Sequence, residues 1–138
     1  MIFYILFLNF FISNEQPQFE LKINIHNIKY SGKMYFALYD NPDDFNSDDE
    51  SVENMKIAIR EIVKPEKHVL KLKVQKGRYG IKIYIDKNLN QRFDTNIIGL
   101  PKEQFGFSND AMGIIGPPTY EKASFLVNEN KLIKIKMK

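Results

Sequence analysis

Apolar and polar residues alternate along several short runs of this chain, and this alternation constrains the fold more than any other feature. It is clearest in residues 19–26, which read Phe-Glu-Leu-Lys-Ile-Asn-Ile-His, and in residues 132–137, where lysines separate apolar residues. A period of two is typical of a β-strand with one buried face. We predict about seven strands, separated by turns rich in Gly, Pro and Asn, at residues 19–26, 33–40, 55–63, 69–74, 79–85, 120–127 and 132–137.

About seven short strands joined by turns favour an all-β sandwich of two packed sheets. One apolar row of each strand would face the partner sheet, and a lysine-rich row would face solvent and discourage edge-to-edge association. The chain is long enough for one such domain, which we place at residues 14–138. The expected core consists of Leu21, Ile23, Ile25, Leu70, Leu72, Val74, Ile81, Ile83, Ile85, Ile133 and Ile135.

The composition excludes several classes of function. The chain has no cysteine, so disulfides, thiol catalysis and zinc–thiolate sites are excluded. The net charge of +3 comes from 20 Lys and Arg residues against 17 acids, and only three of the basic residues are Arg. Nucleic-acid binders usually gather Arg, Lys and aromatic residues on one face, whereas these lysines are spread singly along strands. We therefore expect no nucleic-acid partner.

Residues 1–12 are almost wholly apolar, and the polar segment 13–17 follows them. This length fits the apolar region of a signal peptide and is too short for a stable membrane span. We predict a signal peptide at residues 1–13 and an exported protein, periplasmic or secreted. No Lys or Arg precedes the run and no Ala-x-Ala site follows it, so a buried first strand or helix is the alternative.

Residues 87–118 show no sustained period and hold four of the seven glycines and three of the six prolines. Irregular loops of this length are uncommon in compact domains unless something orders them or they serve a function. A bound ion is one physical way to order such a loop.

Oxygen-bearing side chains recur at the start of this loop with the spacing of a Ca²⁺-binding loop. Counted from Asp86, they match positions 1, 3, 5 and 9 of an EF-hand, and position 7 would offer a backbone carbonyl. Position 12 is Ile97, which cannot be a ligand, so the missing carboxylate would come from further along the chain. The candidate ligands are Asp86, Asn88, Asn90, the carbonyl of Arg92, Asp94 and Glu103. The alternative is a solvated turn, where Asp and Asn are also common.

Blocks of this loop resemble the domain-of-unknown-function family 2141. They are Asp86-Lys-Asn88-Leu-Asn90-Gln-Arg-Phe93-Asp94-Thr-Asn96, Gly99-Leu-Pro101-Lys-Glu103, Phe105-Gly106-Phe107-Ser108-Asn109 and Gly116-Pro117-Pro118. The resemblance covers about residues 19–138. It implies an exported bacterial domain with an immunoglobulin-like or transthyretin-like sandwich, and no known activity.

Two positions depart from the pattern of that family. Ile85 stands where the family tends to carry His, and Gln91 stands where it tends to carry Gly. We expect Gln91 to need a left-handed backbone, which costs a non-glycine residue about 1 kcal/mol, so the ion would bind more weakly here.

These observations favour a non-catalytic binding or structural module whose long loop is ordered by Ca²⁺, with an unknown protein or glycan as its ligand. The alternative is a hydrolase of envelope carbohydrate that uses Glu103 and Asp94 as an acid–base pair. A third reading is a carrier of a small apolar ligand between the sheets. The only histidines, His26 and His68, lack a Ser or Asp companion for a nucleophilic triad.

Two further groups of residues have a structural reading and a functional one. Phe105 and Phe107 could line a ligand pocket, but we expect them to plug the loop onto the sandwich. An acidic run could hold a second cation or meet a basic partner, but we expect it to be a mobile, solvated loop. It consists of Asp40, Asp43, Asp44, Asp48, Asp49 and Glu50.

Overall fold

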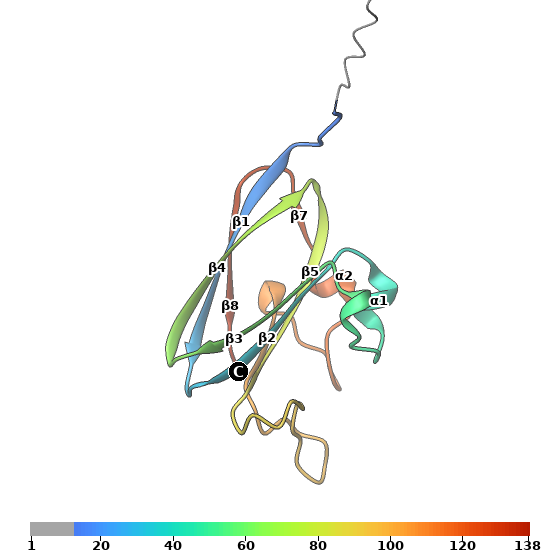
Figure 1. The fold of residues 1–138 in the computed structure, drawn as a ribbon. Helices are drawn as coiled ribbons and strands as arrows, with labels where there is room; N and C mark the ends of the chain where they lie inside the picture. The colour runs from blue at the N-terminus through green and yellow to red at the C-terminus, as the bar shows by residue number, and fades with distance from the viewer. Residues whose placement is uncertain (1–12) are drawn as a thin grey trace, which may run out of the picture.

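The computed structural model describes residues 13–138, so the predicted signal peptide lies almost wholly outside the described residues. Two β-sheets pack face to face, which confirms the all-β sandwich (Figure 1). The smaller sheet has the order β4-β1-β8, with β1 antiparallel to β4 and parallel to β8. Its strands are β1 (Gln18–Ile28), β4 (Glu66–Gln75) and β8 (Lys131–Lys136).

The larger sheet has the order β3-β2-β5-β6, and a short strand, β7, also pairs with β5. All of its pairings are antiparallel. Its strands are β2 (Gly32–Tyr39), β3 (Ile57–Val63), β5 (Gly77–Asp86), β6 (Phe105–Phe107) and β7 (Phe125–Val127). The helical elements are α1 (Pro42–Asn46), α2 (Tyr120–Ala123) and the 3₁₀ turns η1 (Val52–Asn54) and η2 (Ser108–Asp110).

The core lies between the two sheets, as the alternation predicts. Nine of the eleven expected core residues are buried, and Leu72 and Ile133 are partly buried against them. Leu21, Ile23 and Ile25 of β1 face Ile81 and Ile85 of β5, and all five side chains are fully excluded from solvent. The space between the sheets is therefore filled by side chains, which removes the support for an apolar-ligand carrier.

Three predicted segments differ from the structure. The acidic run does not form only a mobile loop: it contains α1, which Asn41 caps through its side chain and Pro42 starts. Phe45 is the one large apolar residue of this acidic segment; it is only 1% exposed and anchors α1 to the sheet. Caps and a first-turn proline stabilise even a short helix.

The predicted strand at residues 120–127 is strand only in its second half. Tyr120 and Ala123, three positions apart, are both buried, which is the spacing of one helical face. The irregular region 87–118 also contains β6, a strand of three residues that is too short to show a period. Phe105 and Phe107 of β6 are half-buried, which agrees with their expected role as plugs.

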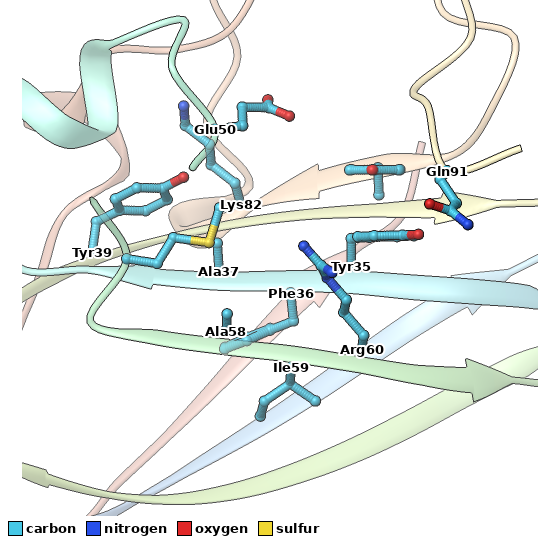
Figure 2. A pocket seen from close by; sticks show the side chains of 12 residues that line it. Tyr35, Phe36, Ala37, Tyr39, Glu50, Ala58, Ile59, Arg60, Lys82 and Gln91 are labelled. Carbon is cyan, nitrogen blue, oxygen red and sulfur yellow. The ribbon is translucent and has the colours of Figure 1, made fainter. Parts of the chain in front are cut away.

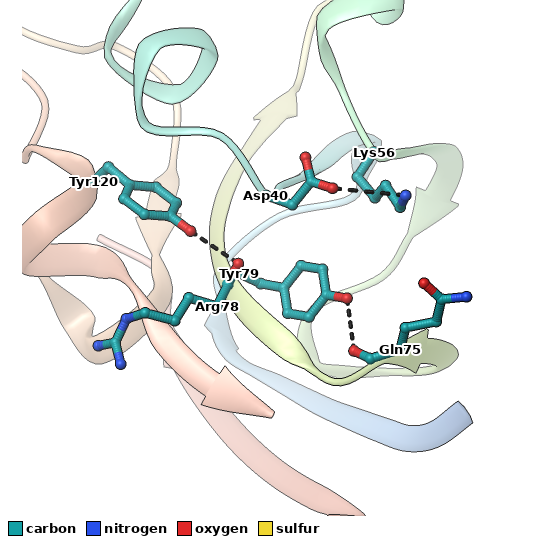
Figure 3. Close-up of polar contacts among 6 residues, drawn as sticks. All are labelled: Asp40, Lys56, Gln75, Arg78, Tyr79 and Tyr120. Carbon is teal, nitrogen blue, oxygen red and sulfur yellow. Dashed lines mark hydrogen bonds and ion pairs between the residues drawn. The ribbon is translucent and has the colours of Figure 1, made fainter. Parts of the chain in front are cut away.

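Both helices lie on the outer face of the larger sheet and form a second small core there (Figure 1). It contains Ala37, Tyr39, Phe45, Tyr120 and Ala123. The hydroxyl of Tyr120 donates to the Arg78 carbonyl of β5 at 2.8 Å and fixes α2 to the sheet (Figure 3). No helix in residues 13–138 is long and apolar enough to cross a membrane.

Candidate functional site

The candidate loop leaves the sandwich where β5 ends, at Asp86 (Figure 1). The Asp86 side chain is completely buried. Its Oδ1 accepts from the backbone N–H of Asn90 at 3.2 Å, and its Oδ2 accepts from that of Gln91 at 2.7 Å. A buried carboxylate needs such donors to offset its desolvation. Asp86 therefore holds the start of the loop in a tight turn.

Asn88 and Asn90 continue this turn through their own side chains. Asn88 Oδ1 accepts from the backbone N–H of Asn90 at 3.2 Å, and Asn90 Oδ1 accepts from that of Arg92 at 2.9 Å. Side chains of Asn form such local turns readily. Arg92 itself is exposed.

Asp94 receives the amide nitrogens of both asparagines. Asn88 Nδ2 lies 2.8 Å from Asp94 Oδ2, and Asn90 Nδ2 lies 2.9 Å from the same atom and 3.0 Å from Oδ1. Hydrogen bonds from Asn90, and next from Asn88, lower the pKa of Asp94 below its ordinary value because they stabilise the ionised carboxylate. Asp94 is thus the negative centre of the exposed part of the loop.

Glu103 closes the loop from the other end of the segment. Its side chain is 6% exposed, and its Oε1 and Oε2 accept from the backbone N–H groups of Lys87 and Asp94 at 2.9 and 3.0 Å. Both oxygens of Glu103 are therefore engaged with the backbone. A general acid must offer a proton to a substrate, and this arrangement gives the hydrolase alternative no support.

The expected left-handed conformation of Gln91 is confirmed, with φ of 65°. Leu89, two residues earlier, has φ of 58°. Only Gly adopts this region without cost, so the tight winding of the loop is held against the preference of two side-chain-bearing residues. The carboxylate of Asp86 supplies the hydrogen bonds that hold it.

Four of the six candidate ligands line one surface pocket of about 350 Å³. Its lining residues are Lys87, Asn88, Asn90, Asp94, Thr95, Lys102 and Glu103. Asp86 is buried and Arg92 is exposed, and neither lines the pocket. Within residues 13–138, no group of three or more Asp, Glu or His side chains is arranged to hold a metal ion. A cation at this pocket would depend on amide and backbone oxygens beside Asp94 and Glu103.

Gln104 is a structural residue that no pattern in the sequence singles out. Its side chain is buried, accepts from Lys29 N at 2.7 Å and donates to the Asn27 carbonyl at 2.9 Å. Its backbone N–H donates to the hydroxyl of Tyr30. The end of the loop is therefore fixed to the turn between β1 and β2. No periodic signal marks a single buried Gln.

Phe93 holds the middle of the loop against the larger sheet. Its ring lies 5.5 Å from that of Tyr84 and 6.1 Å from that of Phe105, centroid to centroid. Aromatic pairs at these separations are favourable beyond their buried area. The loop is thus fixed at its start by Asp86, in its middle by Phe93 and at its end by Glu103 and Gln104.

Neither the curated proteins nor the solved structures that were compared with this chain give a significant match. A family model does match, over residues 23–135, and its description is "Uncharacterized protein conserved in bacteria (DUF2141)". The match covers both sheets and the whole candidate loop. The chain therefore belongs to the DUF2141 family.

Proposed function

We propose that this protein is an exported, non-catalytic binding module whose loop from Asp86 to Glu103 binds Ca²⁺. The observation that supports the proposal is the gathering of Asn88, Asn90, Asp94 and Glu103 around one pocket at the end of the sandwich. Calcium takes six to eight oxygen ligands from carboxylates, side-chain amides, backbone carbonyls and water. This pocket offers the first two kinds in one place.

The hydrogen bonds of the loop are compatible with an added cation. An ionised carboxylate has about four lone-pair sites, so two backbone hydrogen bonds leave each Glu103 oxygen able to accept further. The amide groups of Asn88 and Asn90 now present nitrogen to Asp94. A half-turn of either amide about χ2 would present oxygen instead, at the cost of its local turn bond.

Two lysines at the pocket lower the affinity for calcium that we expect. Lys87 and Lys102 both line it and would repel a cation. The ammonium of Lys87 lies 4.9 Å from the centre of the Tyr30 ring, so it contacts an aromatic ring and not the carboxylates of the pocket. With these lysines and with Gln91 in place of Gly, we expect weak binding, in the range of roughly 10⁻⁴ to 10⁻³ M that extracellular calcium modules show.

The test is thermal unfolding of the mature protein with calcium and with excess chelator. Calcium at about one hundred times its dissociation constant adds about 2.7 kcal/mol to the free energy of unfolding, which raises the melting temperature by roughly 10 °C for a domain of this size. Asp94→Asn should abolish the calcium-dependent difference, because it removes the exposed charge while it keeps the side-chain shape.

Asp48→Asn is the matched control, because Asp48 is an exposed acid away from the pocket. It should keep the full calcium response. Equal melting temperatures of the native protein in calcium and in chelator would refute the ion site. If Asp94→Asn keeps the same calcium-dependent rise in melting temperature as Asp48→Asn, calcium binds elsewhere.

A further inference from the structure

The outer face of the larger sheet has a hollow of about 270 Å³ that is distinct from the candidate ion pocket (Figure 2). The strand register explains it. Ala58 of β3, Ala37 of β2 and Lys82 of β5 lie side by side in one row across the sheet. The two adjacent alanines, at the β3 end of this row, leave a gap beside the bulkier side chains of the neighbouring rows. The gap is the floor of the hollow.

One wall of the hollow is the next row of the same sheet. Tyr35 and Tyr84 stack with their centroids 4.6 Å apart and their planes within 2°. The guanidinium of Arg60 lies 5.1 Å from the centre of the Tyr35 ring. The ring faces are therefore already in use, and the wall offers ring edges, hydroxyls and a guanidinium. Aromatic ring edges carry partial positive charge.

The other side of the hollow holds a second cation. The ammonium of Lys82 lies 5.3 Å from the centre of the Tyr39 ring and 4.8 Å from that of Phe45. Met55 and the exposed Glu50 complete this side, and Glu50 is the only acid that lines the hollow.

Neither cation is paired with a carboxylate. The ion pairs found in residues 13–138 join Lys56 to Asp40 and His68 to Glu61, and neither includes Arg60 or Lys82. Burial lowers the pKa of Lys82, and the charges of Glu50 and Asp48 offset this only in part. The desolvation of this half-buried ammonium is thus compensated only in part, and an anion placed beside it would add to the compensation.

We propose that this hollow binds the carboxylate of a small organic ligand or of an acidic sugar unit. Arg60 and Lys82 pair with the carboxylate, and the floor of Ala37 and Ala58 with Met55 receives the apolar body. Arg suits a carboxylate because its planar fork can donate two parallel hydrogen bonds. The proposal names a ligand class for the binding module but rests on residues other than the calcium ligands.

Backbone amide NMR of the mature protein can test this site with defined probes. Glucuronate and benzoate are the carboxylate probes, and glucose and benzyl alcohol are their neutral counterparts. At least one carboxylate should shift the amides of Ala37, Ala58 and Lys82, and the neutral probes should not. Stronger binding of glucuronate indicates an acidic sugar unit, and stronger binding of benzoate indicates a free aromatic acid.

Three variants separate the site from general electrostatics. Arg60→Gln and Lys82→Met should each weaken the binding by about tenfold or more, since each removes a charged hydrogen-bond donor. Lys33→Gln is the matched control, because the Lys33 ammonium lies 5.9 Å from the centre of the Tyr35 ring but does not line the hollow. It should leave the affinity unchanged. Arg60 is exposed, so Arg60→Gln should stay folded, and a loss of affinity in this variant reports on the binding site.

The proposal is overturned if no carboxylate probe shifts the amides of the hollow, or if all three variants bind alike. The titration is run both in calcium and in chelator. If carboxylate binding persists in chelator while the melting temperature does not respond to calcium, the carboxylate site is supported and the ion site is rejected. If the protein neither binds a carboxylate probe nor melts at a higher temperature in calcium, both sites are rejected.

Discussion

The three acids of the loop, Asp86, Asp94 and Glu103, differ in burial and in the groups that they hold. Asp86 and Glu103 are buried and each accepts two backbone N–H groups. Asp94 accepts only side-chain amides and is more exposed. The spacing of these acids can be read from the sequence. Their different roles depend on burial, which the sequence does not display: Asp86 is buried away from the pocket, Glu103 is buried and lines it, and Asp94 is its more exposed acid.

Gln91 offers a direct measure of the cost of winding this loop. We expect Gln91→Gly to raise the free energy of unfolding by up to about 1 kcal/mol, because Gly adopts a φ of 65° without the penalty of a Cβ. Urea unfolding is the measurement. The neighbouring Arg92→Gly should lower stability by about 0.5–1 kcal/mol, because a negative φ gives Gly no advantage there. A loss in both variants would show that Gln91 is not strained.

Ser108 is a second residue whose role depends on its surroundings. Its buried hydroxyl accepts from Ile81 N at 2.9 Å and donates to the Ala123 carbonyl at 2.6 Å. We expect Ser108→Ala to cost about 2 kcal/mol, because it leaves a buried donor and a buried acceptor unpaired. The exposed Ser31→Ala is the control and should stay within about 0.5 kcal/mol of the parent. Equal urea midpoints for the two variants would contradict this role.

At the scale of elements, alternation predicted the long strands and failed for the short elements. Residues 19–26 lie within β1 and residues 132–136 within β8, and every second side chain of these two runs is buried or partly buried against the core. α1, α2 and β6 are three to five residues long, and each is held by one or two contacts rather than by a period. Phe45 and Tyr120 make those contacts for the helices, and their partners are distant in the sequence.

Phe45 should therefore be the residue on which α1 depends. Its ring packs against those of Tyr39 and Tyr120 at 5.5 and 5.7 Å. We expect Phe45→Ala to cost about 3 kcal/mol in urea unfolding and to speed amide exchange in α1. Phe93→Ala is the comparison, with a smaller loss because Phe93 is 37% exposed. Unchanged stability and exchange in the Phe45 variant would restore the prediction of a mobile, solvated segment.

At the scale of the whole molecule, the sandwich has one face whose chemistry arises only from register. Tyr35, Ala58 and Lys82 lie far apart in the sequence, and only the pairing of β3, β2 and β5 makes them neighbours. A one-residue change in register would move each of them to the opposite face. For that reason the candidate ion loop, which is local in sequence, could be predicted, and the hollow could not.

The same face should control alkaline unfolding. Burial first, and then the charges of Glu50, Asp44 and Asp49, raise the pKa of Tyr39 from 10.0 to about 12. Because the folded value is the higher one, the stabilisation is complete below pH 10 and is lost as the pH rises to about 12. Burial also raises the pKa of Tyr84 and of three other tyrosines, so we expect several phenolates with a delayed titration by ultraviolet absorbance and one fewer of them in Tyr39→Phe. A phenolate set that titrates wholly near pH 10 would contradict the burial of this ring.

The central claim is that the loop from Asp86 to Glu103 gathers oxygen atoms around a cation. The most direct measurement is anomalous X-ray diffraction from crystals of the protein grown with calcium. The account predicts an anomalous peak beside Asp94 and Glu103, with oxygen atoms of Asn88 and Asn90 among ligands at about 2.3–2.6 Å. A map without such a peak, in which both asparagines still donate their amide nitrogens to Asp94, would contradict it.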